Sequence, residues 1–156
     1  MGLMKILLVS DTHGHDEIYQ ELYRIYPKMD LYLDAGDSQV DQESIYPFIS
    51  VRGNCDYYPF DDKYRVYTPI GYLLMKHKPH FSKEEIENNK ILIHGHTHMV
   101  DVYEENNKVF VCPGSTSLSR DISNGSYIIL DLNEEKSEAV VYKTKTKSIL
   151  TRIKIR

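Results

Sequence analysis

The sequence has little cysteine, no long apolar run and no excess of positive charge. Its two cysteines, Cys55 and Cys112, are too few for a disulfide framework and favour the reducing cytoplasm as the setting. No apolar run approaches the length that spans a bilayer, so we expect no membrane association. Residues 1–9 lead directly into a strand-like run without a small-residue cleavage site, and we therefore expect no signal peptide.

The formal net charge of −4 argues against the broad basic surface that holds extended nucleic acid. The balance is uneven, because residues 143–156 carry six lysines or arginines and no acid. We interpret this segment as a solvated terminal strand whose lysines discourage edge-to-edge pairing. A small anion-attracting or partner-binding tail is the alternative.

What the sequence does contain is ordinary for a globular protein. Its 156 residues are 41% hydrophobic and 27% charged, which is enough to bury a core without disulfides or metals as staples. No linker, repeat or low-complexity segment divides the chain. We therefore predict a single domain over residues 1–156.

The first half of the chain alternates between strand and helix patterns. Apolar residues recur at helical spacing from Asp16 to Tyr26, and Pro27 closes that helix. Strands are expected at residues 5–9, 31–33 and 48–51, with a short helix at 42–47. This alternation requires crossover connections and hence a parallel or mixed sheet.

The second half is mostly β. Its expected strands cover residues 64–67, 71–75, 90–93, 100–103, 109–111, 125–132 and 138–145. Ser82 and Glu85 form a capping box that opens a short helix. The predicted fold class is α/β, in the α+β sense.

Polar side chains stand where these apolar runs end. In the stretch from Ile91 to His98, residues two apart point the same way, so His96 and His98 converge as a transition-metal site would require. Five others lie at the carboxyl ends of earlier runs: Asp11, His13, Asp37, Asn54 and His77. Because ligands gather outside the carboxyl ends of strands in open α/β sheets, we expect these side chains to form one site.

The seven side chains mix oxygen and imidazole ligands without a thiolate. This chemistry favours Mn²⁺, Fe, Co, Ni or Zn²⁺ over Ca²⁺, with Mn²⁺ as the first choice. Seven ligands are too many for one tetrahedral ion and suit two divalent ions about 3.5–4 Å apart. Asp37 is the best candidate for a bridging carboxylate, because it lies between the two groups in the chain and follows Gly36.

The chain carries five short motifs whose order resembles that of the calcineurin-like metallophosphoesterase superfamily. They are D-x-H, G-D, G-N-x-D, a lone histidine after a strand, and G-H-x-H. Within the superfamily, the chain resembles the small prokaryotic YfcE-like phosphodiesterase branch. Three features carry this likeness: the short length, the G-N-C-D form of the third motif, and residues 112–115 (C-P-G-S). The resemblance spans roughly residues 4 to 145. It implies a two-sheet β-sandwich flanked by helices, with a dinuclear site at one edge.

The resemblance also implies which side chains bind each metal. Asp11, His13, Asp37 and His98 would hold one ion, and Asp37, Asn54, His77 and His96 the other. It implies a phosphodiesterase in which a metal-bridging hydroxide attacks phosphorus in small or nucleotide-like diesters. Asp37, Asn54 and His77 would then act at the reaction centre. The natural substrate stays open, as does assembly into a homo-oligomer.

Two positions depart from the pattern of relatives. Many relatives in the wider superfamily have a histidine where this chain has Cys55, and that histidine is proposed to assist the leaving group. A free thiol is a poor replacement, so we expect a preference for aryl diesters, whose leaving group needs no proton. Lys78-Pro79-His80 also replaces a glycine-histidine pair, which leaves both His77 and His80 as candidate ligands. We prefer His77, because it is nearer the strand end.

Two further residues, His94 and Asp56, lie next to the candidate ligands, and one rival function stays open. We expect His94 to hydrogen-bond a neighbouring ligand and Asp56 either to orient the Asn54–Cys55 loop or only to form a turn. The rival function is a weak or inactive scaffold, since a eukaryotic retromer subunit has a similar fold and no catalysis. All seven ligating side chains are present here, which favours the enzyme.

Overall fold

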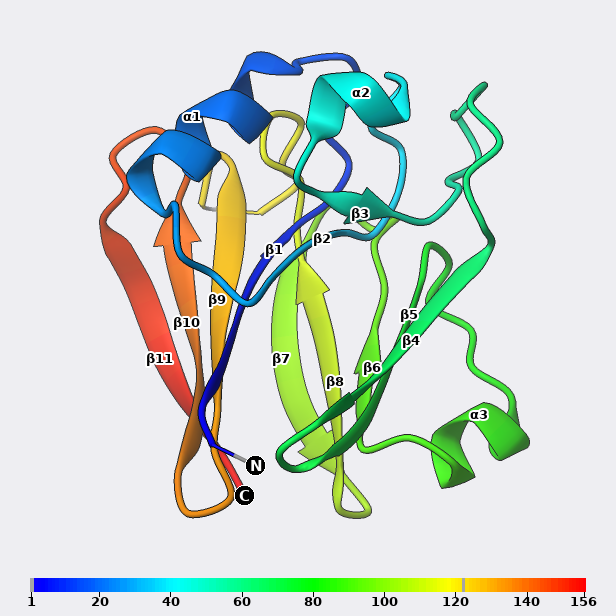
Figure 1. The fold of residues 1–156 in the computed structure, drawn as a ribbon, viewed down its shortest axis with the longest axis vertical. Helices are drawn as coiled ribbons and strands as arrows, with labels where there is room; N and C mark the ends of the chain where they lie inside the picture. Colours follow the sequence, from blue (N-terminus) through cyan, green and yellow to red (C-terminus); the bar gives the residue numbers. More distant parts are fainter. Residues whose placement is uncertain (1, 122) are drawn as a thin grey trace.

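The computed structural model describes residues 2–121 and 123–156, and its strands form two mixed sheets that face each other (Figure 1). The six-stranded sheet has the order β11-β10-β9-β1-β2-β3. Its strands are β1 (Met4–Val9), β2 (Leu31–Asp34), β3 (Ile49–Ser50), β9 (Ser126–Leu132), β10 (Ser137–Lys143) and β11 (Ile149–Ile155). The five-stranded sheet has the order β4-β5-β6-β8-β7. Its strands are β4 (Lys63–Thr68), β5 (Gly71–Lys76), β6 (Ile91–Ile93), β7 (Val100–Glu105) and β8 (Lys108–Pro113).

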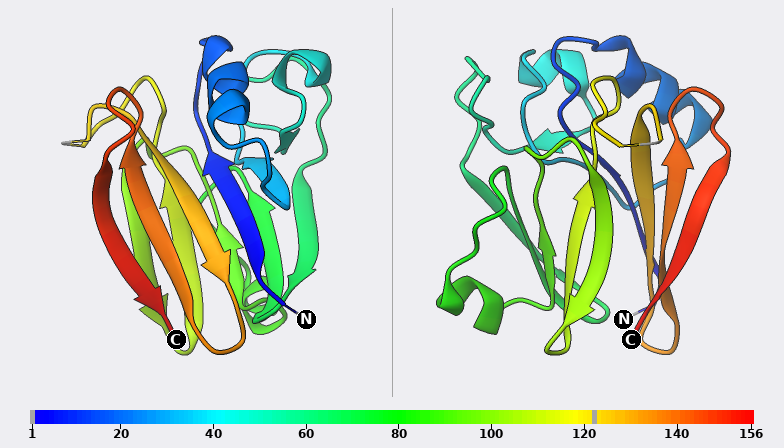
Figure 2. Two further views of the ribbon diagram at one scale, coloured as in Figure 1. Left: turned by 60° about the vertical axis from the view of Figure 1, so that its left-hand side comes forward. Right: turned by 180° about the vertical axis from the view of Figure 1, so that it is seen from behind.

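Three short helices complete the described fold: α1 (Glu17–Ile25), α2 (Gln42–Ile45) and α3 (Lys83–Glu87). Helices α1 and α2 lie together at one end of the sandwich, as two further views also show (Figure 2). The capping box predicted for α3 is confirmed, because the Ser82 hydroxyl accepts the Glu85 N–H and the Glu85 carboxylate accepts the Ser82 N–H. None of the described helices has both the length and the apolar character needed to cross a bilayer.

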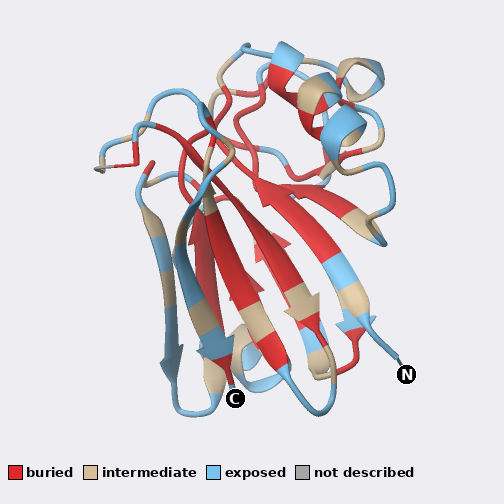
Figure 3. Cartoon of the chain, turned by 90° about the vertical axis from the view of Figure 1, so that its left-hand side faces the viewer, coloured by how far each residue is buried: buried red, intermediate tan, exposed pale blue. Residues whose placement is uncertain are grey.

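Alternation along β1 explains how one sheet serves two cores. Ile6 and Leu8 point into the main core between the two sheets. Leu7 and Val9 point to the opposite face and join a second core with α1. Successive strand residues face opposite sides, so a strand that is apolar throughout must be covered on both. The burial of β1 is visible beside the exposed edge strands (Figure 3).

The crossovers bring several strand ends to one edge. Strands β1, β2 and β3 are mutually parallel, and so are β5, β6 and β8. The carboxyl ends of these strands meet at the end of the sandwich that carries α1 and α2, at the top of Figure 1. The expected mixed sheet and the two-sheet architecture are confirmed.

The carboxyl-terminal segment is the edge strand β11, which pairs antiparallel with β10. Most of its residues are exposed or partly exposed, including Arg152 and Lys154. The expectation of a terminal strand is therefore confirmed, whereas the alternative role in binding an anion or a partner stays a prediction. Cationic side chains on an edge strand discourage pairing with another sheet.

Candidate metal centre

The seven side chains predicted from the sequence lie together at the shared strand-end edge. Each follows a strand directly or within a few residues, and the loops after β1, β2, β3, β5 and β6 contribute all of them. Two groups of ligand atoms result, each within 4.8 Å of one another: Asp11, His13 and His98 in one, and Asp37, His77 and His96 in the other.

Backbone strain is concentrated in these loops. Asp11, His13, Asp37, His96 and His98 all have positive φ angles, between 48° and 74°. Non-glycine residues rarely adopt this left-handed conformation, although aspartate and histidine do so more readily than most. Strain of this kind persists where the surrounding structure enforces it, and it clusters at functional sites.

Two motif glycines permit the loops to approach one another. A Cβ atom at Gly53 would collide with the Asp37 carboxylate and backbone, and one at Gly95 would collide with the Ser10 hydroxyl and lie 2.9 Å from Asp11 Oδ2. The glycines of the G-N and G-H motifs are therefore needed for close packing behind the acids.

In the first group, the acid and both imidazoles face one another. Asp11 Oδ1 lies 3.4 Å from His98 Nε2 and 3.8 Å from His13 Nε2. The two Nε2 atoms are 3.2 Å apart. Asp11 is completely buried and His13 is partly exposed, so this group opens to solvent on the His13 side.

The second group has the same construction with one additional oxygen. Asp37 Oδ2 lies 3.2 Å from His77 Nε2, which lies 2.9 Å from Asn54 Oδ1. His96 Nδ1 lies 3.3 Å from His77 Nε2 and 3.2 Å from Asn54 Oδ1. Asp37 Oδ2 is also 3.9 Å from His13 Nε2, so it faces both groups.

Hydrogen bonds behind three histidines fix which ring nitrogen faces the site. The Nδ1 atoms of His13, His77 and His98 donate to Gln39 Oε1 (2.7 Å), the Ala35 carbonyl (2.8 Å) and the Leu118 carbonyl (2.8 Å), respectively. With the proton on Nδ1, a neutral imidazole presents the lone pair of Nε2 to the centre. Metal-ligating histidines are typically oriented in this way.

The arrangement passes a physical test for a cation site. Asp11 Oδ2 accepts hydrogen bonds from the Ser10 hydroxyl (2.6 Å) and the His96 N–H (3.0 Å), whereas buried Asp11 Oδ1 has no hydrogen-bond partner within the described chain. The facing Nε2 atoms of His13 and His98 are both acceptors once their Nδ1 protons are committed. Such acceptors need a proton or a cation between them, and the donor set suits a divalent transition metal.

The pKa directions follow from the same contacts. Burial raises the pKa of Asp37, but the contact with the His77 imidazole and the hydrogen bond from the Cys55 N–H outweigh it and lower the pKa below its ordinary value. Burial lowers the pKa of His77, but Asp37, the Ala35 carbonyl and Asp11 raise it overall. Burial and the neighbouring His77 lower the pKa of His96. The Asp37 carboxylate is thus ionised at neutral pH and available as a ligand.

His77, rather than His80, is the histidine that contacts the other candidate ligands. His77 is buried, and its ring contacts both Asp37 and Asn54. His80 is exposed and belongs to neither group of ligand atoms within the described residues. The difference arises because His77 directly follows β5, while Pro79 carries the chain away from the sheet edge.

Asp56 connects two of the ligand-bearing loops. Its Oδ2 accepts the N–H groups of Asp37 (3.0 Å) and Gly53 (2.7 Å), and its Oδ1 accepts the Gln39 N–H (2.8 Å). The bond to Gly53 forms the expected turn, and the other two hold the loop after β2. Asp56 therefore supports the candidate ligand Asp37 and the loop bearing Asn54.

The expectation for His94 was wrong. His94 Nδ1 donates to the Gly95 carbonyl at 2.9 Å, and its ring packs near Phe81. It makes no hydrogen bond to a candidate ligand side chain among the described residues, because β6 ends at Ile93 and the turn at Gly95 redirects the chain.

The sequence reasoning missed one neighbour of the centre, Gln39, which orients His13. It placed Cys55 beside the leaving group but not among the possible ligands, and the thiol shares a third group of ligand atoms with His13 and Asp37. Burial and nearby Asp37 raise the pKa of the Cys55 thiol. Only the position of Cys55 inside the G-N-C-D motif could have pointed to the thiol, and no sequence pattern marks Gln39.

The fold and this cluster define a class: a two-sheet α/β protein whose histidine and carboxylate side chains, on the loops at one sheet edge, could hold a divalent metal. A model of the calcineurin-like phosphoesterase superfamily domain matches residues 4–135. The chain belongs to this superfamily. A relative from Bacillus subtilis, the probable metallophosphoesterase YsnB, is 26% identical, and the alignment covers 89% of this chain and 90% of YsnB.

Solved structures share the fold. A predicted phosphoesterase from Streptococcus pneumoniae aligns with a TM-score of 0.85 at 20% identity, covering 99% of each chain. YfcE, a phosphoesterase from E. coli, aligns with a TM-score of 0.79 at 23% identity, covering 98% of this chain and all of YfcE. Vps29 from Entamoeba histolytica, in complex with Zn²⁺, aligns with a TM-score of 0.70 at 19% identity, covering 98% of this chain and 100% of Vps29. Family and relatives together support a metal-dependent phosphoesterase, a hydrolase.

Proposed function

We propose that the chain is a two-metal phosphodiesterase acting on small or nucleotide-like diesters, with Mn²⁺ as the preferred ion. The observation that carries this proposal is the pairing of two ligand groups around Asp37 Oδ2, which lies 3.2 Å from His77 Nε2 and 3.9 Å from His13 Nε2. Asp11, His13, Asp37 and His98 would hold one ion. Asp37, Asn54, His77 and His96 would hold the other.

When bound, the ions supply a water of lowered pKa as the nucleophile and offset the negative charge that develops on the phosphoryl oxygens. The chain's own residues orient the ligands and admit the substrate. Gln39 and the carbonyls of Ala35 and Leu118 hold three imidazoles in one tautomer. Asn54 and His96 are the exposed members of the centre, so the substrate enters from their side.

Asn54 is suited to contact phosphate. Its amide is neutral, so it adds no repulsion toward a phosphodiester anion. Its Oδ1 faces His77 and His96, and its Nδ2 lies 3.6 Å from Cys55 Sγ. An amide whose oxygen faces the ion has an N–H group left for a phosphoryl oxygen.

The proposal is tested by comparing bis(p-nitrophenyl) phosphate with p-nitrophenyl phosphate in the presence of Mn²⁺. We expect the diester to be hydrolysed at least about 10-fold faster in kcat/KM than the monoester. His77→Ala should abolish turnover, and His80→Ala, which removes an exposed histidine nearby, is the matched control. Preference for the monoester, or a His77→Ala variant as active as the wild type, would contradict the proposal.

A protein-interaction module is the second candidate, and the fold likeness to Vps29 favours it. Such a module would bind metal without turning over either ester. The presence of ligating side chains at all seven positions favours the enzyme, since a scaffold needs none of them for catalysis. Metal-loaded protein that hydrolyses neither substrate would decide for the module.

A further inference from the structure

A cationic cleft of about 440 Å³ opens directly beside the candidate metal centre. Its lining is Arg52, Gly53, Asn54, Asp62, Lys63, Lys76, His77 and Lys78. Two of these, Asn54 and His77, belong to the second ligand group. A molecule held at that group can therefore extend into the cleft without leaving the site.

The cleft is positive although the chain as a whole is not. It contains four lysine or arginine side chains and one carboxylate, whereas the formal net charge of the protein is −4. A cleft lined mainly by one sign of charge focuses its field and raises the local concentration of counter-charged ligands. The local excess therefore attracts an anion to the edge of the metal centre.

Two of the four cations already have a partner. Lys63 and Lys76 contact the Glu85 carboxylate at 2.7 Å and 2.9 Å. Burial raises the pKa of Glu85, but these lysines and the Ser82 N–H outweigh it and lower the pKa to about 2. Glu85 therefore stays ionised and paired with Lys63 and Lys76. These two lysines line the cleft but already have a counter-charge.

The other two cations are uncommitted. Arg52 and Lys78 are exposed, and neither side chain forms an ion pair or hydrogen bond within the described residues. They come from different loops, Arg52 from the one after β3 and Lys78 from the one after β5, and they flank Asn54 and His77 in the sequence. The Arg52 N–H donates to the Asp61 carbonyl at 2.9 Å, which closes its loop.

A second cleft near the centre has the opposite character. It adjoins His13 through Gln39 and is lined by Gln39, Val40, Asp41, Tyr57, Tyr58 and Pro59. It contains aromatic rings and a carboxylate but no cation. An additional anionic group on a substrate is therefore expected to lie on the Arg52 side.

We propose that the cleft of Arg52 and Lys78 binds a second phosphate group of the substrate, so that the preferred substrates are nucleotide-like esters with more than one phosphate. The proposal rests on the proposed function and narrows its substrate class. A guanidinium binds phosphate oxygens through paired N–H donors, and an ammonium adds a point charge. Arg52 and Lys78 provide one of each.

The test measures binding rather than turnover. Isothermal titration of the Mn²⁺-loaded full chain compares thymidine 3′,5′-bisphosphate with thymidine 5′-monophosphate. We expect the bisphosphate to bind about 10-fold more tightly to the wild type, since two charge-assisted contacts outweigh the cost of ordering two exposed side chains. The double variant Arg52→Gln/Lys78→Gln should bring the ratio of the two affinities close to one.

The matched control is Lys136→Gln/Lys154→Gln, which removes the same charge from exposed positions outside the cleft. This variant should keep the wild-type ratio. The proposal would be overturned if the wild type bound the bisphosphate and the monophosphate equally tightly. It would also be overturned if both double variants lowered the ratio of the two affinities to the same extent. Hydrolysis of the aryl diester is measured separately, so failure of the cleft proposal and failure of the phosphodiesterase proposal give different results.

Discussion

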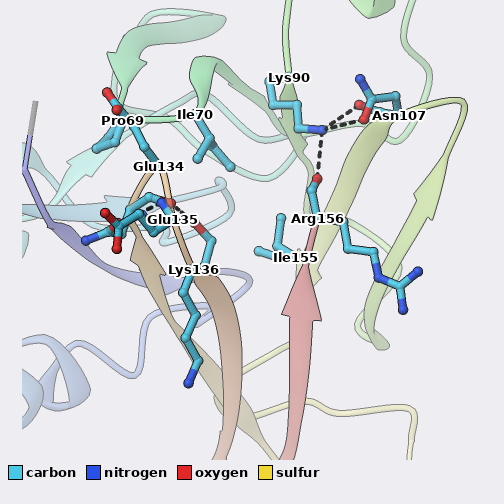
Figure 4. A pocket seen from close by; sticks show the side chains of 11 residues that line it. Pro69, Ile70, Lys90, Asn107, Glu134, Glu135, Lys136, Ile155 and Arg156 are labelled. Atoms are coloured by element: carbon cyan, nitrogen blue, oxygen red, sulfur yellow. Dashed lines mark hydrogen bonds between the residues drawn. The ribbon is translucent and has the colours of Figure 1, made fainter.

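The hollow at the far end of the sandwich differs from the candidate metal centre in how its polar groups are satisfied (Figure 4). There, Lys90 Nζ donates to the Asn107 carbonyl (2.7 Å), Asn107 Oδ1 (3.1 Å) and the Arg156 carbonyl (3.1 Å). All three ammonium protons are used. This hollow is a structural junction between the β7–β8 turn, β6 and the end of the chain.

At the metal centre the acceptors face one another instead. Asp11 Oδ1 has no hydrogen-bond partner in the described chain, and the Nε2 atoms of His13 and His98 meet at 3.2 Å. The shape of a hollow alone therefore does not identify the functional site. Hydrogen-bond acceptors that face one another without a donor do identify it, because only an added cation or proton satisfies them.

The largest expected effect breaks the centre at its shared carboxylate. Asp37→Asn keeps the size of the side chain but removes the charge that faces both ligand groups. We expect kcat/KM for the aryl diester to fall at least about 1,000-fold, as when a transition-state contact is lost. Steady-state kinetics with Asp101→Asn, an exposed acid on β7, as the control would check this. A loss of less than about 10-fold would show that Asp37 is not shared.

Gly53→Ala tests the close packing behind the acids. The new Cβ would overlap the Asp37 carboxylate and backbone. We expect about 2–3 kcal/mol of destabilisation in denaturant unfolding, the usual cost of overpacking, with loss of activity. Gly2→Ala, where a Cβ meets nothing within 4 Å, is the control. An unchanged unfolding free energy in Gly53→Ala would show that the loop can accommodate a Cβ atom at this position.

Asp34 makes the site end sensitive to pH. Burial raises its pKa to about 8, although hydrogen bonds from the Tyr19 hydroxyl and the Gly36 N–H oppose the shift. The folded state therefore holds a proton that the unfolded chain releases above its ordinary pKa. Stability from this group is complete in acid, declines as pH rises from about 4, and is lost by about pH 8.

Asp34→Asn resembles the protonated acid and cannot ionise. Its stability relative to the wild type should rise by about 4 kcal/mol between pH 5 and pH 9, because the buried acid of the wild type loses a bound proton on unfolding in that range and the asparagine does not. Urea unfolding at several pH values measures the difference. If the unfolding free energies of the two proteins changed with pH in the same way, Asp34 would not be a protonated buried acid in the folded state.

Cys55→His tests leaving-group protonation at the centre. The raised pKa of the thiol makes it a weak proton donor at neutral pH. We expect about a 10-fold gain in kcat for an alkyl diester and little change for an aryl diester, because only an alkoxide leaving group needs a proton. An unchanged rate on the alkyl diester would show that proton donation is not the deficit.

The smallest effect concerns the far hollow. Lys90→Met removes three hydrogen bonds near the surface, two to oxygens of Asn107 and one to the backbone oxygen of Arg156. We expect a loss of about 1 kcal/mol in unfolding free energy and no change in kcat/KM. Reduced hydrolysis by a stably folded Lys90→Met protein would contradict the purely structural role of the far hollow.

The sequence was sufficient for most of the fold and for the cluster's members. Apolar runs of strand length and the helical spacing from Asp16 to Tyr26 are local signals, and the structure follows them. The polar residues Asp11, Asp37 and His96 were found because each follows such a run. Crossover connections then bring their strand ends to one edge.

What the sequence could not predict depends on contacts between distant loops. The positive φ angles of the ligand-bearing residues and the carbonyls of Ala35 and Leu118 behind His77 and His98 carry no residue-type signal. The cationic cleft likewise joins Arg52 and Lys78 from separate loops. His94 was misjudged because alternation was extended past the end of β6.

The most direct test of the paired centre is a metal count. Protein purified without chelator, incubated with Mn²⁺ and freed of unbound metal would be analysed by inductively coupled plasma mass spectrometry against protein concentration. Two ligand groups that share Asp37 predict about two manganese ions per chain. A ratio of one or less at saturating Mn²⁺ would contradict the two-metal assignment.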